Sequence, residues 1–273
     1  MNLQSIREQL DQERRTLRVD GLELEILPLV TRIRSDNGSH HSILFSSLSD
    51  ENADSVIAEQ AAHYRALGAE VEWKAYAHDQ PADLLQRLAR HGFEIGPLET
   101  VLVLDLHDRP KWMHESAHDV IRVKTPEQVD LFRTAATEIF QKDYAFTINE
   151  LLAAIRTGSS QQLGYIALND NVPASIGRLY THPQSVFGGL YGGGTLATHR
   201  GRGLYRAVVA ARARDAAKLG SRFLIVDALP TSRPILERLG FVRLTDTWPC
   251  VLRPGGIPQA FSQLSEISDR VIR

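Results

Sequence analysis

Hydrophobic and polar positions follow helical and strand periods along the chain, which predicts a mixed α/β protein. The first half opens with Leu3, Ile6 and Leu10 at helical spacing, and then shows an apolar–polar alternation over 22–26 that Pro28 bends or ends. Further strands are predicted over 41–48, 70–76 and 99–106, with helices over 49–67 and 81–91. Strands and helices therefore alternate through the first hundred residues.

The second half shows the same kind of alternation. Pro126 sits where a helix opens, and Gly220 sits where a long helix, 204–219, stops. The other elements predicted here are a short helix over 149–156 and strands over 120–123, 163–168, 175–180 and 222–228. The tail from 257 to 273 carries little information, and we expect one terminal helix there.

The two halves repeat one order of elements. A helix end (62–68), a strand (70–76) and a Leu-x-Arg-Leu stretch before Gly92-Phe93 have counterparts at 215–220, 222–228 and before Gly240-Phe241. This spacing suggests an internal duplication. The helix of the first copy begins with the acidic stretch 49–54, whose carboxylates would satisfy the positive helix end and repel a diphosphate. We therefore predict that the first copy is degenerate.

The segment 187–205 is the most informative stretch of the chain. Five of its glycines, Gly188, Gly189, Gly192, Gly193 and Gly194, lie among residues that favour strand, which indicates a bulge or a close backbone approach. A glycine turn and the first turn of a helix follow directly. The unpaired N–H groups of such a turn bind anions, and arginines add full charges. The residues predicted to hold a phosphate are Arg200, Gly201, Arg202, Gly203, Leu204, Tyr205 and Arg206. The alternative is an ordinary strand-to-helix turn with solvated arginines.

Two common phosphate motifs are excluded. The Walker pattern needs a Lys after its glycines, and the dinucleotide fingerprint fails because Arg206 stands at its last glycine. The segment instead resembles the acetyl-CoA site of GNAT-type N-acetyltransferases, [QR]-x-x-G-x-[GA] after a bulged strand: Arg200 and Gly203 match, whereas Tyr205 replaces Gly or Ala and Ala197 replaces a common proline. The stretch 232–241, a short helix ending in Gly-Phe, is similar to the second signature of that family.

The resemblance covers about residues 119 to 253 and implies a fold. We expect an α/β protein of two tandem GNAT-like units, each a mixed central sheet flanked by helices. The predicted boundaries are a degenerate domain over 1–108, a linker over 109–118, an acetyltransferase domain over 119–254 and a tail over 255–273.

The resemblance also implies a function: transfer of an acetyl group from acetyl-CoA, as cosubstrate, to a primary amine of a small molecule or peptide. By correspondence with the family, the N–H groups around Gly193, Gly194 and Thr195 pair with the pantetheine arm and the acyl oxygen. The usual Tyr general acid is replaced by Leu236, and Ser232 stands in for the usual Asn at the start of that helix. The candidates for proton transfer are Tyr205, Tyr191 and Asp227; packing or capping is the structural alternative for each.

Two further functions stay open. Because Leu236 replaces the acid, the protein could be a non-catalytic acyl-CoA-binding or regulatory protein. The stretch 114–118 reads His-Glu-Ser-Ala-His, the H-E-x-x-H pattern of zinc hydrolases. That chemistry needs both histidines on one face of a sustained helix, and Pro110 before the motif and a predicted strand after it argue against one. We therefore expect no metal site and read 107–118 as solvated linker.

Composition limits the partners and the location. Lys and Arg number 31 against 33 Asp and Glu, so we expect no binding to nucleic acid or to a membrane surface. Cys250 is the single cysteine, which excludes a disulfide framework, and its predicted strand indicates a buried small hydrophobic residue. No long apolar run or signal-peptide pattern appears near Met1, and we expect a cytoplasmic protein. The acceptor and the oligomeric state are open at this point.

Overall fold

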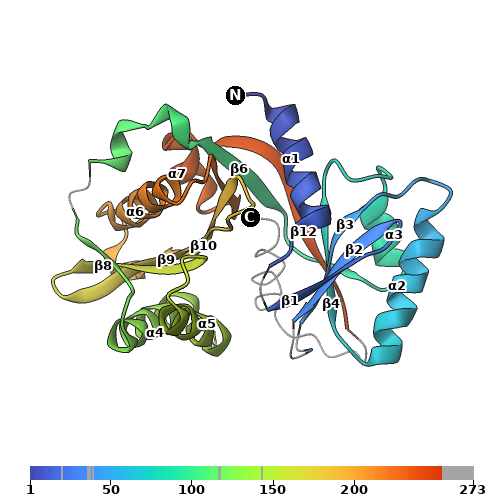
Figure 1. Ribbon diagram of the computed structural model, residues 1–273, viewed down its shortest axis with the longest axis horizontal. Helices are drawn as coiled ribbons and strands as arrows, with labels where there is room; N and C mark the ends of the chain where they lie inside the picture. Colours follow the sequence, from blue (N-terminus) through green and yellow to red (C-terminus); the bar gives the residue numbers. More distant parts are fainter. Residues whose placement is uncertain (20, 36–37, 39, 116–117, 143, 254–273) are drawn as a thin grey trace. The chain divides into compact units, whose positions relative to one another are not determined.

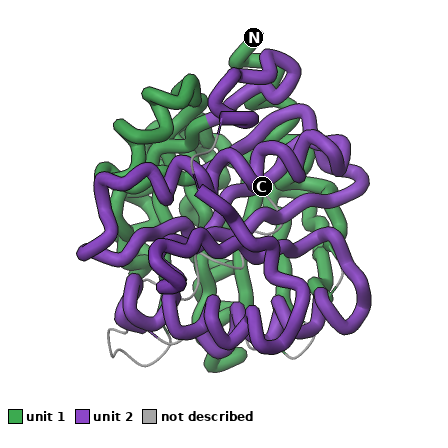
Figure 2. The backbone as a smooth tube through the Cα atoms, turned by 90° about the vertical axis from the view of Figure 1, so that its left-hand side faces the viewer, with its two compact units in different colours: residues 1–102, 227–272 green, residues 103–226, 273 purple. Residues whose placement is uncertain are grey.

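The computed structural model describes residues 1–19, 21–35, 38, 40–115, 118–142 and 144–253 (Figure 1). The backbone divides into two compact units, shown in different colours in Figure 2. Of the described residues, unit 1 contains Met1–Leu102 and those from Asp227 to Arg253, and unit 2 contains Val103–Val226. No helix in the described part of the chain is both long and apolar enough to cross a membrane. The predicted terminal helix, 257–273, lies outside the described residues.

Unit 1 is a mixed sheet with helices. Its sheet runs in the order β1-β2-β3-β4-β12, in which β3 and β4 are parallel, the other pairs are antiparallel, and β5 pairs with β12. Its elements are α1 (Leu3–Thr16), β1 (Leu22–Ile26), β2 (Val30–Ser35), β3 (His41–Ser46), α2 (Ala53–Leu67), β4 (Val71–Tyr76), α3 (Leu84–Arg90), β5 (Glu94–Ile95), the start of β6 (Glu99–Asp105), α7 (Arg233–Arg238) and β12 (Val242–Leu252).

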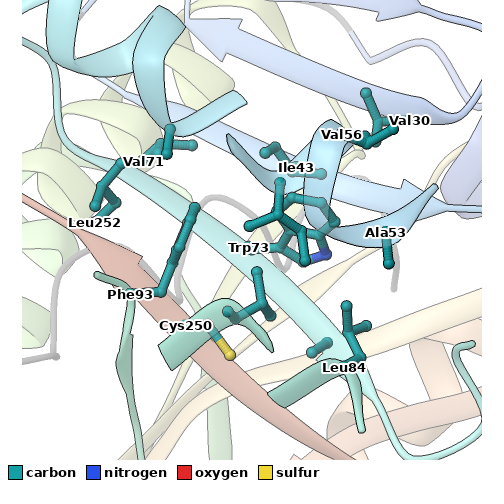
Figure 3. Close-up of a cluster of buried hydrophobic side chains, with 14 of the residues drawn as sticks. Val30, Ile43, Ala53, Val56, Val71, Trp73, Leu84, Phe93, Cys250 and Leu252 are labelled. Carbon is teal, nitrogen blue, oxygen red and sulfur yellow. The ribbon is translucent and has the colours of Figure 1, made fainter. Parts of the chain in front are cut away.

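A hydrophobic core fills the space between this sheet and the helices α2 and α3. Trp73 of β4 is fully buried and lies in one cluster with Ile43 of β3, Ala53 at the start of α2 and Leu84 at the start of α3 (Figure 3). The alternation of β4 explains this, because every second side chain of a strand points to the same face. Cys250 belongs to the same cluster, and burial raises the pKa of its thiol, so its expected role as a small buried residue is confirmed.

The strands of unit 2 are also mixed and follow the order β11-β10-β9-β8-β7, with α6 on one face and α4 and α5 on the other (Figure 1). The strands β10 and β11 are parallel and the other pairs are antiparallel. Its elements are the end of β6, η1 (Leu106–Asp108), η2 (Lys111–Met113), β7 (Val120–Arg122), α4 (Pro126–Phe140), α5 (Ala145–Thr157), β8 (Gln162–Asn169), β9 (Val172–Tyr180), β10 (Phe187–Thr195), η3 (Ala197–His199), α6 (Leu204–Lys218) and the start of β11 (Phe223–Ala228).

The repeated order expected from the sequence is present as β3-α2-β4-α3-β6 and β10-α6-β11-α7-β12. The ends of α3 and α7 are built alike: the N–H of Phe93 donates to Leu88 at 3.0 Å and the N–H of Phe241 donates to Leu236 at 3.2 Å. The glycine before each phenylalanine has a φ near 93°. Leu88 is therefore the counterpart of Leu236, which shifts by three residues the alignment that the Leu-x-Arg-Leu pattern suggested.

The last strand of each half of the sequence, β6 or β12, belongs wholly or partly to the compact unit formed by the other half. Strand β12 pairs with β4 in unit 1 from Leu252 opposite Val71 to Thr247 opposite Tyr76. The end of β6 belongs to unit 2, where the Leu106 N–H donates to the carbonyl of Arg222, just before β11, at 2.9 Å. The compact units therefore differ from divisions that follow chain order, and the predicted boundaries at 108 and 119 stay a prediction about family domains.

Some predicted elements differ from the structure. Strand β2 was not expected, and α5 begins at Ala145 rather than at 149. The segment predicted to be solvated linker contains two short 3₁₀ turns, and Trp112 and Met113 in the second are buried at 8% and 2% exposure. The expectation that 107–118 is solvated is thus wrong for these two residues, whose apolar side chains pack into unit 2.

Candidate functional site

Strand β10 carries a bulge in the middle of its glycines. Tyr191 pairs with Arg178 of β9, and the next regular pair joins Gly194 to Ile176. Two residues, Gly192 and Gly193, therefore oppose one residue of β9, which is the definition of a bulge. Gly192 has a φ of 48°, a conformation that favours glycine. The bulge expected from the sequence is present.

Most of these glycines serve the packing of helices on the sheet. A Cβ added to Gly188 would lie 3.1 Å from Ala216 of α6, and one on Gly194 would lie 2.5 Å from Ile139 of α4. The sequence had suggested that bare backbone lets a ligand lie along this strand. The structure gives a different reason, since the protein's own side chains occupy both faces at these positions. What β10 leaves for a ligand is its backbone edge.

That edge lies outside the ladder with β11, because β10 and β11 separate early. Their parallel pairing covers Phe187–Phe223, Gly188–Leu224 and Gly189–Ile225 and goes no further among the described residues. From Leu190 on, the backbone groups of β10 on this side have no partner in that ladder. Unpaired N–H and C=O groups at a strand edge are the groups that an extended ligand pairs with.

A tight turn connects β10 to α6. Gly201 and Gly203 both have left-handed backbones, with φ of 77° and 83°, which other residues adopt at a cost. Gly203 is the N-cap of α6, no side chain caps that end, and no acidic residue lies in the first turn. The first N–H groups of α6, from Leu204 onward, therefore have no capping side chain, and the helix dipole adds partial positive charge there.

Three arginines surround this helix start. Arg200, Arg202 and Arg206 are exposed, and in the part of the chain that the structure describes none of them forms an ion pair with a carboxylate. Arg200 folds back along β10, where its Nε donates to the carbonyl of Thr195 at 3.3 Å. The Thr195 hydroxyl shares a hydrogen bond of 2.8 Å with that of Ser175. The predicted phosphate-binding residues are thus gathered at one end of α6.

The second histidine of the H-E-x-x-H pattern lies beside this turn. His118 Nε2 donates to the backbone carbonyl of Arg202 at 2.6 Å, and the ring is half-buried. His114 and Glu115 are exposed and follow the turn at 111–113 without a helix. A helix that presents both histidines on one face is therefore not formed by the described residues of the motif. His118 was expected to be a solvated linker residue. In the structure it instead hydrogen-bonds to the glycine turn.

Tyr205 lies directly under the bulge. A Cβ on Gly193 would lie 3.0 Å from its ring carbon Cε2 and 3.6 Å from its hydroxyl oxygen. The side chain is half-buried, and burial raises the pKa of the phenol, an effect that the Arg212 guanidinium opposes. The structure thus brings this proton-transfer candidate next to the glycines predicted to bind the acyl donor.

Tyr191 points into the unit instead. Its side chain is 4% exposed and packs edge-to-face on Tyr180, with ring centroids 4.8 Å apart. The guanidinium of Arg178 lies 6.0 Å from the Tyr191 ring centroid, within cation–π range. These contacts are typical of a core tyrosine.

The third candidate, Asp227, belongs to unit 1. Its carboxylate pairs with Lys74 Nζ at 2.7 Å, and both side chains are almost fully buried. Leu236 of α7, at the position of the family acid, is also fully buried. An aspartate already paired with an ammonium is a weak base, because the positive charge favours the carboxylate form.

Sequence reasoning missed Arg212, the most unusual residue near the bulge. It lies on the buried face of α6 and is 1% exposed. Its Nη1 donates to the carbonyls of Arg178 and Tyr191 at 3.1 and 3.4 Å, which belong to the last residue pair of β9 and β10 before the bulge. The available signal was an arginine inside the apolar stripe of a helix, between Val209 and Ala213.

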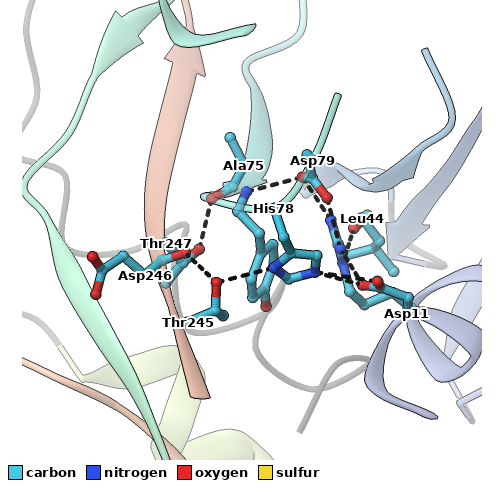
Figure 4. Close-up of polar contacts among 10 residues, drawn as sticks. Asp11, Leu44, Ala75, His78, Asp79, Thr245, Asp246 and Thr247 are labelled. Atoms are coloured by element: carbon cyan, nitrogen blue, oxygen red, sulfur yellow. Dashed lines mark hydrogen bonds and ion pairs between the residues drawn. The ribbon is translucent and has the colours of Figure 1, made fainter. Parts of the chain in front are cut away.

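One cluster in unit 1 has the composition of a metal site. Asp11, His78 and Asp79 each offer a ligand atom within 4.8 Å of the others. The guanidinium of Arg14, however, donates to both oxygens of Asp79 at 3.0 Å, and also to Asp11 at 2.6 Å (Figure 4). This arginine occupies the acceptor positions that a cation would need, so the cluster is a structural network.

Comparisons with known proteins give the fold. No family model and no curated protein match the sequence. The structure is similar to a GCN5-related N-acetyltransferase from Kribbella flavida, with a TM-score of 0.62 and 14% identity over 93% of this chain and 95% of that one. A GCN5-related N-acetyltransferase from Sphaerobacter thermophilus gives a TM-score of 0.57 at 13% identity, covering 86% and 84%.

A tandem GNAT protein from the clavulanic acid biosynthesis pathway is also similar, with a TM-score of 0.56 and 13% identity over 84% of this chain and 79% of that chain. These likenesses cover most of both chains, and they agree with the resemblance seen at Arg200 and Gly203. The predicted fold class is confirmed. The chain has the fold of the GCN5-related N-acetyltransferases.

Proposed function

We propose that unit 2 binds an acyl-CoA, with acetyl-CoA as the donor, and transfers its acyl group to a primary amine of a small molecule or peptide. The observation that carries the proposal is the start of α6: it has no capping side chain, two left-handed glycines lead into it, and the three arginines around it have no carboxylate partner among the described residues. A diphosphate supplies the acceptors and the negative charge that this arrangement lacks.

The bulged strand supports the rest of the donor. The arm that follows the diphosphate is an extended chain with amide groups, which pair with the backbone edge of β10 from Gly192 onward, where the regular pairing with β11 has ended. In the proposed complex the N–H groups around Gly193, Gly194 and Thr195 face the acyl oxygen. Backbone donors aimed at a developing oxyanion contribute about 3–4 kcal/mol each to the stability of a transition state.

The reaction moves one acyl group and one proton. The neutral amine attacks the thioester carbonyl carbon, a C–N bond forms, and the C–S bond breaks with its electron pair going to sulfur. The amine nitrogen loses a proton and the thiolate gains one. A free thiol has a pKa of about 8.5, so the thiolate is a good leaving group, and an acid near it contributes at the low end of general acid catalysis.

Tyr205 is the proposed acid. It lies against Gly193 and stays partly exposed, whereas Tyr191 is packed in the core and Asp227 is paired with Lys74. We expect Tyr205→Phe to lower kcat roughly 100-fold, the low end for general acid catalysis. The variants Tyr191→Phe and Asp227→Asn, measured in parallel, are expected to lower kcat less. A larger loss in either of them reassigns the acid.

The binding proposal is tested at Gly203 with a matched pair of variants. Gly203→Asn and Gly203→Asp add side chains of the same size at a left-handed position that both residues tolerate better than most, and only Asp adds a negative charge. We expect acetyl-CoA to raise the melting temperature of the wild type and of the Asn variant, and to leave that of the Asp variant unchanged. Equal protection of the two variants would remove the diphosphate from this site.

One observation favours a second function, an acyl-CoA-binding protein without catalysis. Leu236, fully buried, stands where the family has its acid. The discriminating measurement is thiol release from acetyl-CoA across a panel of small amines and peptide N-termini. Release with any amine supports the transferase, whereas tight acetyl-CoA binding without release over the whole panel supports the binding protein.

A further inference from the structure

Arg212 of α6 hydrogen-bonds to both strands next to the bulge of β10. A bulge interrupts the ladder between two strands and leaves backbone groups without their regular partners. The carbonyls of Tyr191 and Arg178 form the last regular pair before it, and both accept from Arg212 Nη1. The Nε of Arg212 donates within the helix to Val208 at 3.3 Å, which fixes the stem of the side chain. One guanidinium therefore ties both strands to α6 at this point.

Two glycines make room for this group. A Cβ on Gly177 would lie 2.8 Å from Arg212 Cζ and 2.9 Å from Nη1, and a Cβ on Gly193 would lie 3.3 Å from Nη2. Contacts shorter than about 3 Å force atoms apart. Neither glycine has a left-handed backbone, so the space taken by the guanidinium and, at Gly193, also by the Tyr205 ring accounts for the absence of a side chain. Gly177 is the single residue of β9 that faces the bulge.

Arg212 is also buried without an ion pair. Among the described residues no carboxylate lies within salt-bridge distance of it, and the polar groups that face it, the Tyr205 phenol and backbone carbonyls, are neutral. A buried charge without a counter-charge costs stability. A small apolar residue would fill the face of α6 at lower cost, as the alanines around Arg212 do. The position of this arginine therefore has a use other than stability.

We propose that Arg212 is a positioning residue for acyl transfer: it sets the geometry of the β10 bulge, so that the N–H groups around Gly193 face the thioester oxygen. The inference rests on the function proposed above. It assigns no contact between Arg212 and the substrate. The guanidinium acts through the backbone, by holding the carbonyls of Tyr191 and Arg178, the residue pair next to the bulge, at fixed positions.

The first test measures kcat and coenzyme A affinity for Arg212→Met, which keeps the length of the side chain and removes its donors. A misplacement of about 1 Å at a reacting group costs about 100-fold in rate. We expect kcat to fall about 100-fold, while the Kd for coenzyme A, whose diphosphate binds at the start of α6, stays within about fivefold. A kcat close to the wild-type value overturns the proposal, and so does a loss that lies wholly in Kd.

Gly177→Ala tests the same guanidinium from the opposite side. The added Cβ displaces Arg212 without removing it, and we expect kcat to fall at least tenfold. The double variant is expected to lose much less activity than the sum of the two single losses, expressed as activation free energies, because both substitutions act through one group. Fully additive losses overturn the proposal. Arg133→Met, an exposed α4 arginine paired with Asp130, is the matched control and is expected to keep kcat within twofold.

A readout independent of turnover separates this inference from the proposed function. In Arg212→Met the peptide covering 187–195 is expected to exchange its amide hydrogens at least tenfold faster than in the wild type, with the β8 peptide unchanged. Equal exchange of 187–195 overturns the role of Arg212 whether or not the protein is a transferase. A wild type that never releases thiol overturns the proposed function but leaves the exchange result readable. Should Arg212→Met fail to fold, Arg212→Lys and Gly177→Ala carry the test.

Discussion

The two halves of the chain solve one structural problem in different ways. In unit 1, β3 also carries a bulge: Phe45 pairs with Thr31 and Ile43 with Arg32, which leaves Leu44 extra. A buried arginine again binds there, as Arg14 Nε donates to the Leu44 carbonyl at 2.9 Å. Arg14, however, is neutralised by Asp79 and Asp11, whereas Arg212 has no such carboxylate among the described residues.

The helix starts differ in the same direction. In unit 1 the region before and within the first turn of α2 is closed by Arg87, which pairs with Asp50 at 2.8 Å and Asp54 at 2.7 Å. The space between β3, β4 and α2 is filled by the cluster around Trp73. Neither helix start has a capping side chain, but the charges at that of unit 1 pair with each other, whereas the three arginines at that of unit 2 have no carboxylate partner among the described residues. Local features that cost stability and are nevertheless retained mark a functional site.

The largest expected difference is between the buried arginines Arg14 and Arg212. Arg14→Met leaves two carboxylates without their cation and is expected to lower the free energy of unfolding by about 3–5 kcal/mol. Arg212→Met leaves only neutral carbonyls without a donor and removes an uncompensated charge, so about 1–3 kcal/mol is expected. Urea unfolding followed by circular dichroism measures both. An equal or larger loss for Arg212→Met contradicts the comparison.

The two bulges should also respond oppositely to side-chain size. Leu44 is fully buried, and Leu44→Ala is expected to cost about 2–5 kcal/mol through the cavity it leaves. Gly193→Ala instead overpacks against Tyr205 and is expected to cost about 1–3 kcal/mol. Unfolding experiments measure these losses. With acetyl-CoA as substrate, only Gly193→Ala is expected to lower kcat at a temperature where both variants are folded, and a similar loss of kcat in Leu44→Ala would show that the bulge of unit 1 matters for turnover.

The helix starts are compared by their charges. Replacing Arg200, Arg202 and Arg206 with Ala is expected to raise the KM for acetyl-CoA about tenfold at low salt, since three exposed charge contacts at about 0.5 kcal/mol each give that factor. The difference should shrink in 0.5 M NaCl because salt screens exposed charges. Arg87→Ala in unit 1 is the control and should leave this KM unchanged. A KM for acetyl-CoA that changes neither in the triple arginine variant nor with added salt would place the diphosphate elsewhere.

The smallest effect is expected for an Asp–Arg ion pair of unit 2, a kind of contact that unit 1 also contains. Asp105 accepts from Arg222 Nη2 at 3.0 Å, and this hydrogen bond lowers the pKa of the carboxyl. The folded state therefore binds that proton less tightly than the unfolded state, so the pair stabilises the fold above about pH 4 and ceases to do so as the pH falls through the lowered pKa. Asp105→Asn is expected to lower the melting temperature at pH 7 and to match the wild type near pH 2. A constant difference across that range would assign the effect to something other than the charge.

Most of the fold could be predicted because local signals agree with it. Helix α4 begins at Pro126, as predicted, since proline opens it and Thr125 caps it. Strand β2 was missed because its sequence does not alternate cleanly: Arg32 and Arg34 interrupt it. These two arginines pair with Glu25 and Glu23 on β1, a tertiary contact that periodicity does not contain.

The candidate site divides in the same way. The bulge and the glycine turn could be predicted, because left-handed and strand-breaking positions restrict the choice of residue so strongly. The role of Arg212 could not, because an arginine on a helix is normally assigned to the solvent face. Its burial depends on Gly177, which lies 35 positions earlier in the chain, and only the folded backbone brings the two together. The same holds for Asp227 and its partner Lys74.

The pairing of β12 with β4 has a consequence for biosynthesis. The sheet of unit 1 begins within the first fifty residues, yet its strand β12 ends at Leu252, close to the end of the chain. During translation the N-terminal half therefore emerges from the ribosome before β12 is made, so one edge of β4 has no strand to pair with. During that interval the unpaired backbone of β4 can hydrogen-bond to a strand of another chain. This edge is covered only after the second half has been translated.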